Sequence, residues 1–273
     1  MSVPTDDAAR DWAAALAGWA IPDEILAQAP ESPWACIPSD FAADRSGTVE
    51  TPSAPLEREV LPIGGTVLDV GCGGGRASLA LAPPAAHITG VDENPAMLAL
   101  LTRTARVRGV ATSTRLGRWP DVAGAAPIVD VVVCHHVVYN VADIVPFLRA
   151  LTAHARLAVV LELTSRHPQA AWSDAWRHFW GVERPTRPTA DDLIALVRAL
   201  GWAPEVWRHQ RRADDDPFRH ADRAVRSTVL RLCLTAERAH EVPAYLAEHP
   251  LRWSDGLVTI RWSVGGGNLK PLG

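Results

Sequence analysis

The sequence predicts an α/β fold: a doubly wound, mostly parallel seven-stranded sheet with helices on both faces. Seven short stretches rich in β-branched and apolar residues alternate with longer segments whose apolar residues recur at helical spacing. Strands that alternate with helices of this length form βαβ units, which build parallel sheets. The strongest strand pattern, IVDVVVCHHVV at 128–138, contains an unbroken apolar run of the kind found in central parallel strands buried on both faces.

Two short helices are expected over residues 5–29, where Trp12, Leu16 and Trp19 recur at helical spacing. Residues 30–62 contain six prolines, which predicts an irregular connection with one short helix around Leu56–Val60. The seven strands are expected at TVLDVG (66–71), HITGVDEN (87–94), ATSTRLG (111–117), IVDVVVCHHVV (128–138), LAVVLEL (157–163), PEVWRHQ (204–210) and GLVTIRWSV (256–264).

Helix boundaries are indicated by local capping patterns. RASLALA (76–82) predicts a helix that Pro83 ends. Asn94 followed by Pro95 resembles an N-cap with proline at the first helical position, and this helix should close near Gly109. A further helix passes through 147–151. Thr189 with Asp192 predicts a capping box at the start of DDLIALVRAL.

Two segments, 165–188 and 211–252, fall outside the alternation and are interpreted as helical additions. We expect residues 1–55 to form an N-terminal helical cap with a proline-rich connection, and 56–273 to form the main domain.

Composition restricts the class of protein. A net charge of -4 over 273 residues does not favour broad binding to nucleic acid or to an anionic membrane. The four cysteines form no C-x-x-C pair, so neither a zinc site nor a disulfide framework is indicated. The N-terminus lacks the pattern of a signal peptide, and no apolar run approaches the roughly 20 residues of a membrane span. We expect a cytoplasmic protein.

A glycine-rich turn follows the first strand. Its glycines are Gly71, Gly73 and Gly75, and Arg76 occupies the position of the third glycine in the dinucleotide fingerprint G-x-G-x-x-G. Asp69 precedes the turn, where a carboxylate would repel a pyrophosphate but could accept hydrogen bonds from an α-ammonium group, directly or through water. Asp92 ends the second strand, where it would face ribose hydroxyls. A ligand with an amino-acid end, a ribose and no phosphates satisfies these three features.

This pattern resembles the class I (Rossmann-like, seven-stranded) S-adenosylmethionine-dependent methyltransferases, over roughly residues 56–210 plus the seventh strand. The resemblance implies that 56–273 is a methyltransferase domain whose cofactor is S-adenosylmethionine and whose product is S-adenosylhomocysteine. It implies that the glycine turn cradles the methionine part and that Asp92 holds the ribose. The block 130–143 is similar to the family's fourth motif, where the end of strand four lines the methyl donor. The expected cofactor-binding residues from these motifs are Asp69, Gly71, Cys72, Gly73, Gly75, Asp92, Glu93 and Cys134.

One departure from the family concerns adenine. Many relatives have an Asp after strand three, whereas this chain has Gly117-Arg118-Trp119-Pro120-Asp121. We expect adenine to contact backbone groups of Arg118 and to stack on Trp119.

Three candidate catalytic residues follow strand four: His135, His136 and Tyr139. Methyl transfer from a sulfonium is an in-line displacement in which alignment contributes much of the rate. A phenol, hydroxyl or amine acceptor would also benefit from a base that titrates near neutral pH, as histidine does. Because adjacent residues on a strand point to opposite faces, at most one of the two histidines is expected to reach the site.

Trp172, Trp176 and Trp180 repeat at i, i+4 and i+8, which places them on one helical face. Core packing is the favoured interpretation; an aromatic lid over an apolar acceptor, together with Trp34 and Phe41, is the alternative. Residues 208–231 carry seven Arg against four Asp, and these arginines are expected on the solvated face of a helix, with RNA contact as the alternative.

The predicted function is transfer of a methyl group from S-adenosylmethionine to an oxygen or nitrogen of a small organic molecule, without a metal. The partner is a small-molecule methyl acceptor, and neither nucleic acid nor membrane is expected. Three alternatives remain. A methyltransferase acting on RNA or protein is disfavoured because no Asn-Pro-Pro-Tyr motif follows strand four. A nicotinamide oxidoreductase is disfavoured by Asp69 and the missing third glycine. A non-catalytic S-adenosylmethionine-binding protein stays open.

Overall fold

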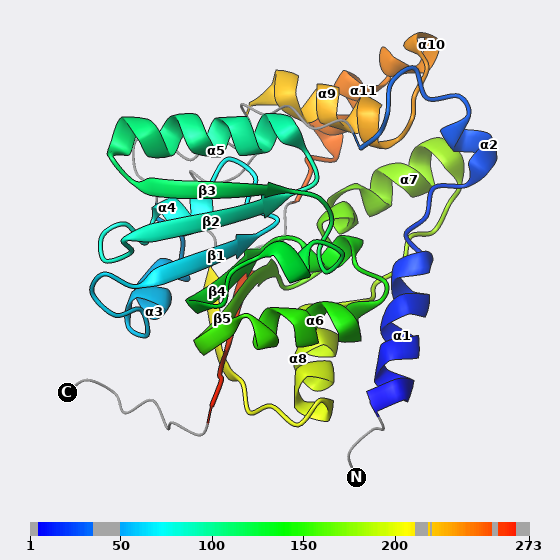
Figure 1. The fold of residues 1–273 in the computed structure, drawn as a ribbon. Helices are drawn as coiled ribbons and strands as arrows, with labels where there is room; N and C mark the ends of the chain where they lie inside the picture. Colours follow the sequence, from blue (N-terminus) through cyan, green and yellow to red (C-terminus); the bar gives the residue numbers. More distant parts are fainter. Residues whose placement is uncertain (1–4, 35–49, 211–217, 219, 253–255, 266–273) are drawn as a thin grey trace.

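The structure is a computed structural model, and it describes residues 5–34, 50–210, 218, 220–252 and 256–265. One seven-stranded sheet forms its centre, in the order β3-β2-β1-β4-β5-β7-β6 (Figure 1). The strands are β1 Thr66–Val70, β2 His87–Asp92, β3 Ala111–Leu116, β4 Val129–His135, β5 Ala155–Thr164, β6 Glu205–Gln210 and β7 Gly256–Ser263.

Strands β1 to β5 are mutually parallel, and β7 runs antiparallel to both of its neighbours, β5 and β6. The predicted doubly wound, mostly parallel sheet of seven strands is therefore confirmed, each strand within a few residues of its expected place. The strand order reverses between β1 and β4, and in such sheets ligands bind outside the carboxyl ends of the strands at this point.

Helices cover both faces of the sheet. On one face, apolar residues of α3, α4 and α5 pack with Val67, Ile88 and Val131. On the other face, α1, α6 and α8 pack with Leu68 and Val132. The helices on the two faces are α3 Ala54–Arg58, α4 Arg76–Leu79 and α5 Pro95–Arg108, and α1 Thr5–Ala17, α6 Ile144–Ala153 and α8 Ala190–Ala199.

The predicted caps are present. The side chain of Asn94 accepts a hydrogen bond from the backbone N–H of Ala96 at 2.9 Å, and α5 ends at Gly109 in a left-handed conformation. Thr189 and Asp192 form the reciprocal capping box of α8. The segment after the glycine turn is the exception, because α4 is a single turn that ends at Leu79, before the predicted stop at Pro83.

A third apolar cluster lies apart from the two sheet faces. It is built by α2 Asp23–Leu26, η4 Pro168–Trp172, α7 Ser173–Trp180, α9 Ala221–Arg231 and α11 Val242–Glu248, with the short α10 Ala236–Ala239 beside them. Figure 1 shows α2, α7, α9 and α11 gathered at the end of the molecule toward which β1, β2 and β3 point. The segments 165–188 and 211–252 therefore contain helices beyond the carboxyl edge of the sheet.

The tryptophan stripe belongs to this third cluster. Trp172 and Trp176 are buried and Trp180 is partly buried in it, which confirms core packing as the favoured interpretation. Trp172 precedes α7 instead of lying within it. Trp34 is 51% exposed, and Phe41 lies outside the described residues. In the described part of the chain, no helix has both the length and the apolar character needed to cross a membrane.

Candidate functional site

The glycine turn after β1 depends on backbone conformations that favour glycine. Gly71, Gly73 and Gly75 have φ values of +70°, +50° and +83°. A Cβ atom on Gly71 would lie 2.2 Å from a methyl carbon of Val137, and one on Gly75 would lie 2.4 Å from a methyl carbon of Leu101. The turn is therefore closed to side chains by both conformation and packing. Such a turn presents backbone groups to a ligand at close range.

Asp92 ties this turn to the end of β2. One carboxylate oxygen accepts the backbone N–H of Gly73 at 2.9 Å, and the other accepts the N–H of Asn94 at 2.9 Å. The N–H groups of Gly71 and Cys72 both donate to the carbonyl of Val91. The partly exposed Asp92 side chain thus lies between the two loops, where the sequence places a ribose-binding acid, and Glu93 beside it is exposed.

Asp69 lies beneath the turn. Its side chain is 1% exposed and accepts a hydrogen bond from the hydroxyl of Ser78 at 2.5 Å. Burial raises the pKa of this carboxyl to about 6, against the lowering effect of Ser78. Cys72 and Cys134 are also buried, and burial raises the pKa of both thiols. All three side chains are turned into the protein, so contacts of Asp69, Cys72 and Cys134 with a ligand stay predictions.

The predicted adenine contacts receive little support from the position of Trp119. This ring is 5% exposed, meets His154 edge-on and donates its indole N–H to the carbonyl of Phe147 at 3.4 Å. It belongs to the core on the α6 side of the sheet. Arg118 is exposed, and its backbone carbonyl accepts a hydrogen bond from Val122. Adenine binding by Arg118 and Trp119 is therefore still only a prediction.

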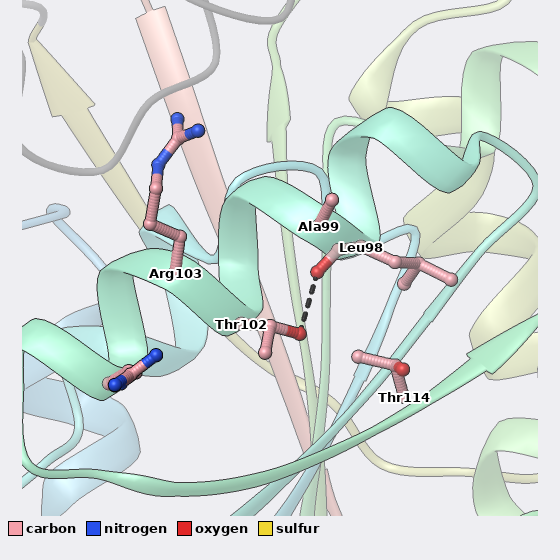
Figure 2. A pocket seen from close by; sticks show the side chains of 6 residues that line it. Leu98, Ala99, Thr102, Arg103 and Thr114 are labelled. Atoms are coloured by element: carbon pink, nitrogen blue, oxygen red, sulfur yellow. Dashed lines mark hydrogen bonds between the residues drawn. The ribbon is translucent and has the colours of Figure 1, made fainter.

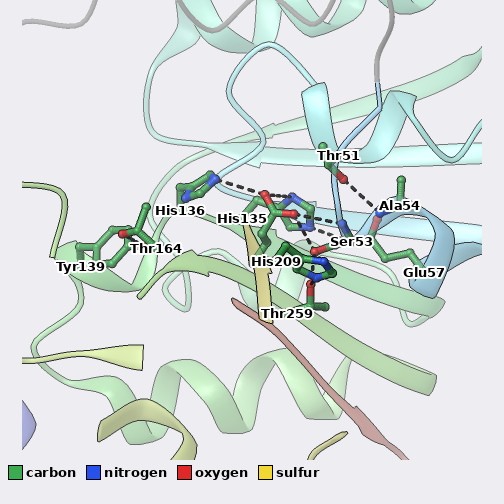
Figure 3. A network of polar contacts seen from close by, with 11 residues as sticks. Thr51, Ser53, Ala54, Glu57, His135, His136, Tyr139, Thr164, His209 and Thr259 are labelled. Carbon is green, nitrogen blue, oxygen red and sulfur yellow. Dashed lines mark hydrogen bonds and ion pairs between the residues drawn. The ribbon is translucent and has the colours of Figure 1, made fainter. Parts of the chain in front are cut away.

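The two histidines after β4 occupy different environments. His135 is 8% exposed, and its Nε2 lies 2.6 Å from a carboxylate oxygen of Glu57. His136 is 42% exposed, and its Nε2 lies 3.3 Å from Oε1 of Glu162. The same oxygen is 3.8 Å from Nδ1 of His135. Figure 3 shows both rings in one polar network with Ser53, His209 and Thr259.

The expectation that the two histidines point to opposite faces is wrong for this pair. Strand β4 ends at His135, and His136 has a φ of +59°, in the left-handed region. The alternation of side chains holds only while the backbone stays extended. The turn at His136 therefore brings both rings to the same carboxylate, while only His136 is substantially exposed.

Opposite charges set the protonation of this buried network. Burial lowers the pKa of His135, but Glu57 and Glu162 outweigh burial and raise it to about 9. Burial raises the pKa of Glu162, yet His135, His136 and Ser53 hold it well below its ordinary value. Burial raises the pKa of Glu57, only partly offset by His135. His135 and Glu162 are therefore an internal ion pair at neutral pH.

Sequence reasoning missed the acids of this network. Glu57 lies in α3 and Glu162 in β5, and both are at most 3% exposed. The available signal was the position of Glu162 in LAVVLEL, where an acid inside an otherwise apolar buried strand calls for a partner. No comparable signal existed for Glu57 or Ser53. Among the residues that the structure describes, no three His, Cys, Asp or Glu side chains form a group that could hold a metal ion.

Tyr139 is engaged in a separate contact. Its hydroxyl lies 2.6 Å from the hydroxyl of Thr164 and accepts the backbone N–H of the same residue. Its ring meets His167 edge-on, and His167 stacks on Trp19 at 4.2 Å. Tyr139 therefore links β5 to the N-terminal helices, and its hydroxyl is already bonded.

Two surface hollows lie away from these residues. One, of about 450 Å³, lies between α5 and β3 and is lined by Leu98, Ala99, Thr102, Arg103, Arg106 and Thr114 (Figure 2). The other, of about 440 Å³, lies near the amino ends of β1, β2 and β4. No predicted site residue lines either hollow. The candidate site is thus defined by the glycine turn, Asp92 and the histidine network at the carboxyl edge.

Comparison with known proteins agrees with this location. Residues 67–157 match a family model described as a methyltransferase domain, and the match covers the glycine turn, Asp92 and both histidines. The ubiquinone biosynthesis O-methyltransferase of Methylobacterium sp. strain 4-46 is 36% identical over 150 residues, which are 55% of this chain and 53% of that protein. The protein of the same name from Azorhizobium caulinodans is 39% identical over 93 residues, which are 34% of this chain and 37% of that one.

The matched region therefore spans about half the length, or less, of each of these two relatives. Solved structures share the fold. A cyclopropane-fatty-acyl-phospholipid synthase-like protein from Lactobacillus casei aligns with a TM-score of 0.54 at 19% identity, covering 82% of this chain and 98% of that chain. The YcgJ protein from Bacillus subtilis aligns with a TM-score of 0.52 at 16% identity, covering 79% and 99%.

Proposed function

We propose that this chain, whose residues 67–157 match a methyltransferase domain, is a class I methyltransferase that transfers a methyl group from S-adenosylmethionine to an oxygen or nitrogen of a small organic molecule. The single observation that supports the cofactor is the turn of three left-handed glycines, in which the Gly73 backbone N–H donates a hydrogen bond to Asp92. The curated relatives are named O-methyltransferases, which favours oxygen as the acceptor atom. A cytoplasmic location is part of the proposal.

The residues of the turn fit the proposed cofactor. A Cβ on Gly71 or Gly75 would clash with Val137 or Leu101, so internal packing requires glycine at both positions and fixes the shape of the turn. Asp92 offers carboxylate oxygens to ribose hydroxyls. Within residues 69–76, Arg76 is the only positively charged residue that could favour a pyrophosphate. S-adenosylmethionine would supply an activated methyl group on a sulfonium at this edge of the sheet.

On the acceptor side, we propose that His136 is the base. Of the three predicted catalytic residues, it combines substantial exposure with a position just past the end of β4. His135 is buried between two carboxylates, and the Tyr139 hydroxyl is bonded to Thr164. A positioned base contributes about 10²- to 10⁴-fold to the rate when the acceptor must lose a proton.

Calorimetric titration tests the cofactor assignment. The chain should bind S-adenosylmethionine and S-adenosylhomocysteine but not NAD. Asp92→Ala should weaken S-adenosylhomocysteine binding about 10-fold or more, because it removes the acceptor for ribose hydroxyls and unties the turn from β2. Asp23→Ala, which removes an exposed aspartate of α2 outside the candidate site, is the matched control. Binding of NAD in place of both sulfur compounds would overturn the proposal, and an unchanged affinity in Asp92→Ala would remove the ribose assignment.

Methyl transfer itself requires an acceptor assay. Radiolabelled S-adenosylmethionine offered with catechols, monophenols and arylamines should label a small molecule. Label in added RNA or protein, with none in the small molecules, would identify one of the alternative methyltransferase classes. Cofactor binding with no acceptor among these pools would favour the non-catalytic binding protein.

A further inference from the structure

Glu162 holds His136 through both its backbone and its side chain. The carbonyl of Glu162 accepts the backbone N–H of His136 at 2.8 Å, and its Oε1 lies 3.3 Å from Nε2 of the imidazole. The strand register pairs His135 directly with Glu162, which puts His136 just beyond the paired region. The carboxylate can therefore orient the one exposed histidine of the network.

The carboxylate is itself held on its other oxygen. Oε2 of Glu162 accepts the backbone N–H of Ser53 at 3.1 Å and the Ser53 hydroxyl at 2.7 Å. The Ser53 hydroxyl lies 2.6 Å from that of Thr259, which in turn lies 2.8 Å from Nε2 of His209. Because all these side chains except His209 are buried, Glu162 has little freedom to move.

Burial of an ionised carboxylate requires compensating charge. His135 supplies it from the other side: its Nδ1 is 3.8 Å from Oε1 of Glu162, and its Nε2 contacts Glu57. With His135 protonated, Glu162 stays ionised, and its Oε1 lies 3.3 Å from Nε2 of His136. Ser53, Glu57, Glu162, Thr259 and His209 all lie outside residues 67–157, which match the family model.

We propose that Glu162 is a positioning residue for the His136 base, an inference that rests on the proposed methyl transfer. Glu162 accepts from Nε2–H of the neutral imidazole, which leaves Nδ1 as the nitrogen with a free lone pair. In the reaction, the acceptor oxygen forms a bond to the methyl carbon while the carbon–sulfur bond breaks with its electron pair on sulfur. The acceptor proton passes to Nδ1 of His136, and the resulting imidazolium is stabilised by Glu162.

Nitrogen-15 NMR of the histidine rings tests this assignment without an acceptor. In the wild-type protein, neutral His136 should carry its proton on Nε2. Glu162→Gln should shift the His136 signals toward a mixture of the two tautomers, because an amide can donate as well as accept. Glu205→Gln is the matched control: it changes an exposed acid of β6 that pairs with Arg261 of β7, and it should leave the His136 signals unchanged. A wild-type His136 protonated on Nδ1 would overturn the proposal.

Kinetics with a catechol probe and calorimetry with S-adenosylhomocysteine provide the second test. Glu162→Gln should lower kcat about 10-fold or more, since orientation of the base acts on the proton transfer. Its KM and its affinity for S-adenosylhomocysteine should stay within about twofold of the wild-type values. Ser53→Ala, which keeps the carboxylate, should lower kcat by a smaller factor and serves if Glu162→Gln does not fold. Wild-type kcat in both folded variants would overturn the proposal.

The proposed function and the proposed role of Glu162 can be disproved independently. If the wild-type protein does not bind S-adenosylhomocysteine, the methyltransferase assignment falls, whatever the tautomer of His136. If it binds the compound and methylates a probe but His136 is protonated on Nδ1, only the role of Glu162 falls.

Discussion

At the scale of single residues, the site depends on backbone conformations that most side chains avoid. His136 is one of two non-glycine residues with positive φ among those that the structure describes; the other is Cys233. A left-handed residue other than glycine is uncommon and persists where surrounding contacts hold it. Here the contacts are the backbone hydrogen bond to Glu162 and the approach of the His136 Nε2 to the Glu162 carboxylate at 3.3 Å. The unusual backbone conformation and the exposed imidazole thus occur at the same residue.

The glycine turn allows a prediction at this scale. Gly71→Ala should destabilise the fold more than Gly109→Ala, although both glycines have a φ of +70°. Each substitution places an L-residue in the left-handed region, at a cost of about 1–2 kcal/mol. A Cβ on Gly109 meets nothing within 4 Å, whereas one on Gly71 meets Val137 at 2.2 Å, which adds about 1–3 kcal/mol of overpacking.

Urea unfolding of the two variants measures the difference, and calorimetry with S-adenosylhomocysteine measures binding. We expect Gly109→Ala to bind normally and Gly71→Ala to lose binding. Equal destabilisation of both variants would show that Val137 moves away at little cost, and normal binding by Gly71→Ala would show that the turn keeps its shape despite the added methyl group.

At the scale of secondary-structure elements, η4 joins the N-terminal helices to the sheet. His167 is the N-cap of η4, stacks on Trp19 from the segment after α1 and meets Tyr139 edge-on. Burial, aided by the charge of Arg184, lowers the pKa of His167 from 6.5 to about 4. Arg184 in turn lies over the rings of Trp19 and Trp176. The contacts at this junction therefore favour the neutral form of the His167 imidazole.

The neutral imidazole predicts a dependence on acid. Because the folded-state pKa is lowered, the contribution of His167 to stability is present above pH 6.5 and is lost as the pH falls toward 4. Between pH 7 and 4.5, the free energy of unfolding of the wild type should therefore fall more steeply than that of His167→Gln. Urea unfolding at several pH values measures both slopes.

His178→Gln, which removes an exposed histidine of α7, is the matched control and should keep the wild-type slope. Parallel curves for the wild type and His167→Gln would show that the imidazole becomes protonated without disturbing the junction.

At the scale of the whole molecule, the buried charges connect α3, β4 and β5 beneath the candidate site. His135, with a pKa raised to about 9 by Glu57 and Glu162 against the effect of burial, favours the folded state when it is protonated. The sign follows from the raised pKa: the stabilisation is complete below pH 6.5 and is lost as the pH rises through 9.

The whole protein should therefore become less stable in alkali. We expect its free energy of unfolding to fall between pH 6.5 and 9.5, as measured by urea unfolding. In the double variant Glu57→Gln/His135→Gln, which replaces the buried pair with two amides, this decrease should be smaller. The surface double variant Glu24→Gln/His178→Gln should behave as the wild type. A wild-type stability that is constant over this range would contradict the assigned protonation of His135.

Patterns among residues close in the sequence predicted the strands and several helix ends. The alternation of apolar runs predicted all seven strands, and Asn94, Gly109, Thr189 and Asp192 marked helix ends that the structure contains. These features are readable because capping and side-chain alternation involve residues a few positions apart. The glycine turn was readable for the same reason, since its requirement for left-handed backbone lies within five residues.

The sequence by itself thus determined the fold class, the glycine turn and the place of Asp92 at the end of β2. Only the tertiary structure decided which histidine is exposed and which acids surround it. Glu57 and His135 are 78 positions apart, and Ser53 and Glu162 are 109 apart. No spacing rule links such residues, because their contacts arise from the order of strands in the sheet and from the left-handed turn at His136, and both are settled by packing of the whole chain.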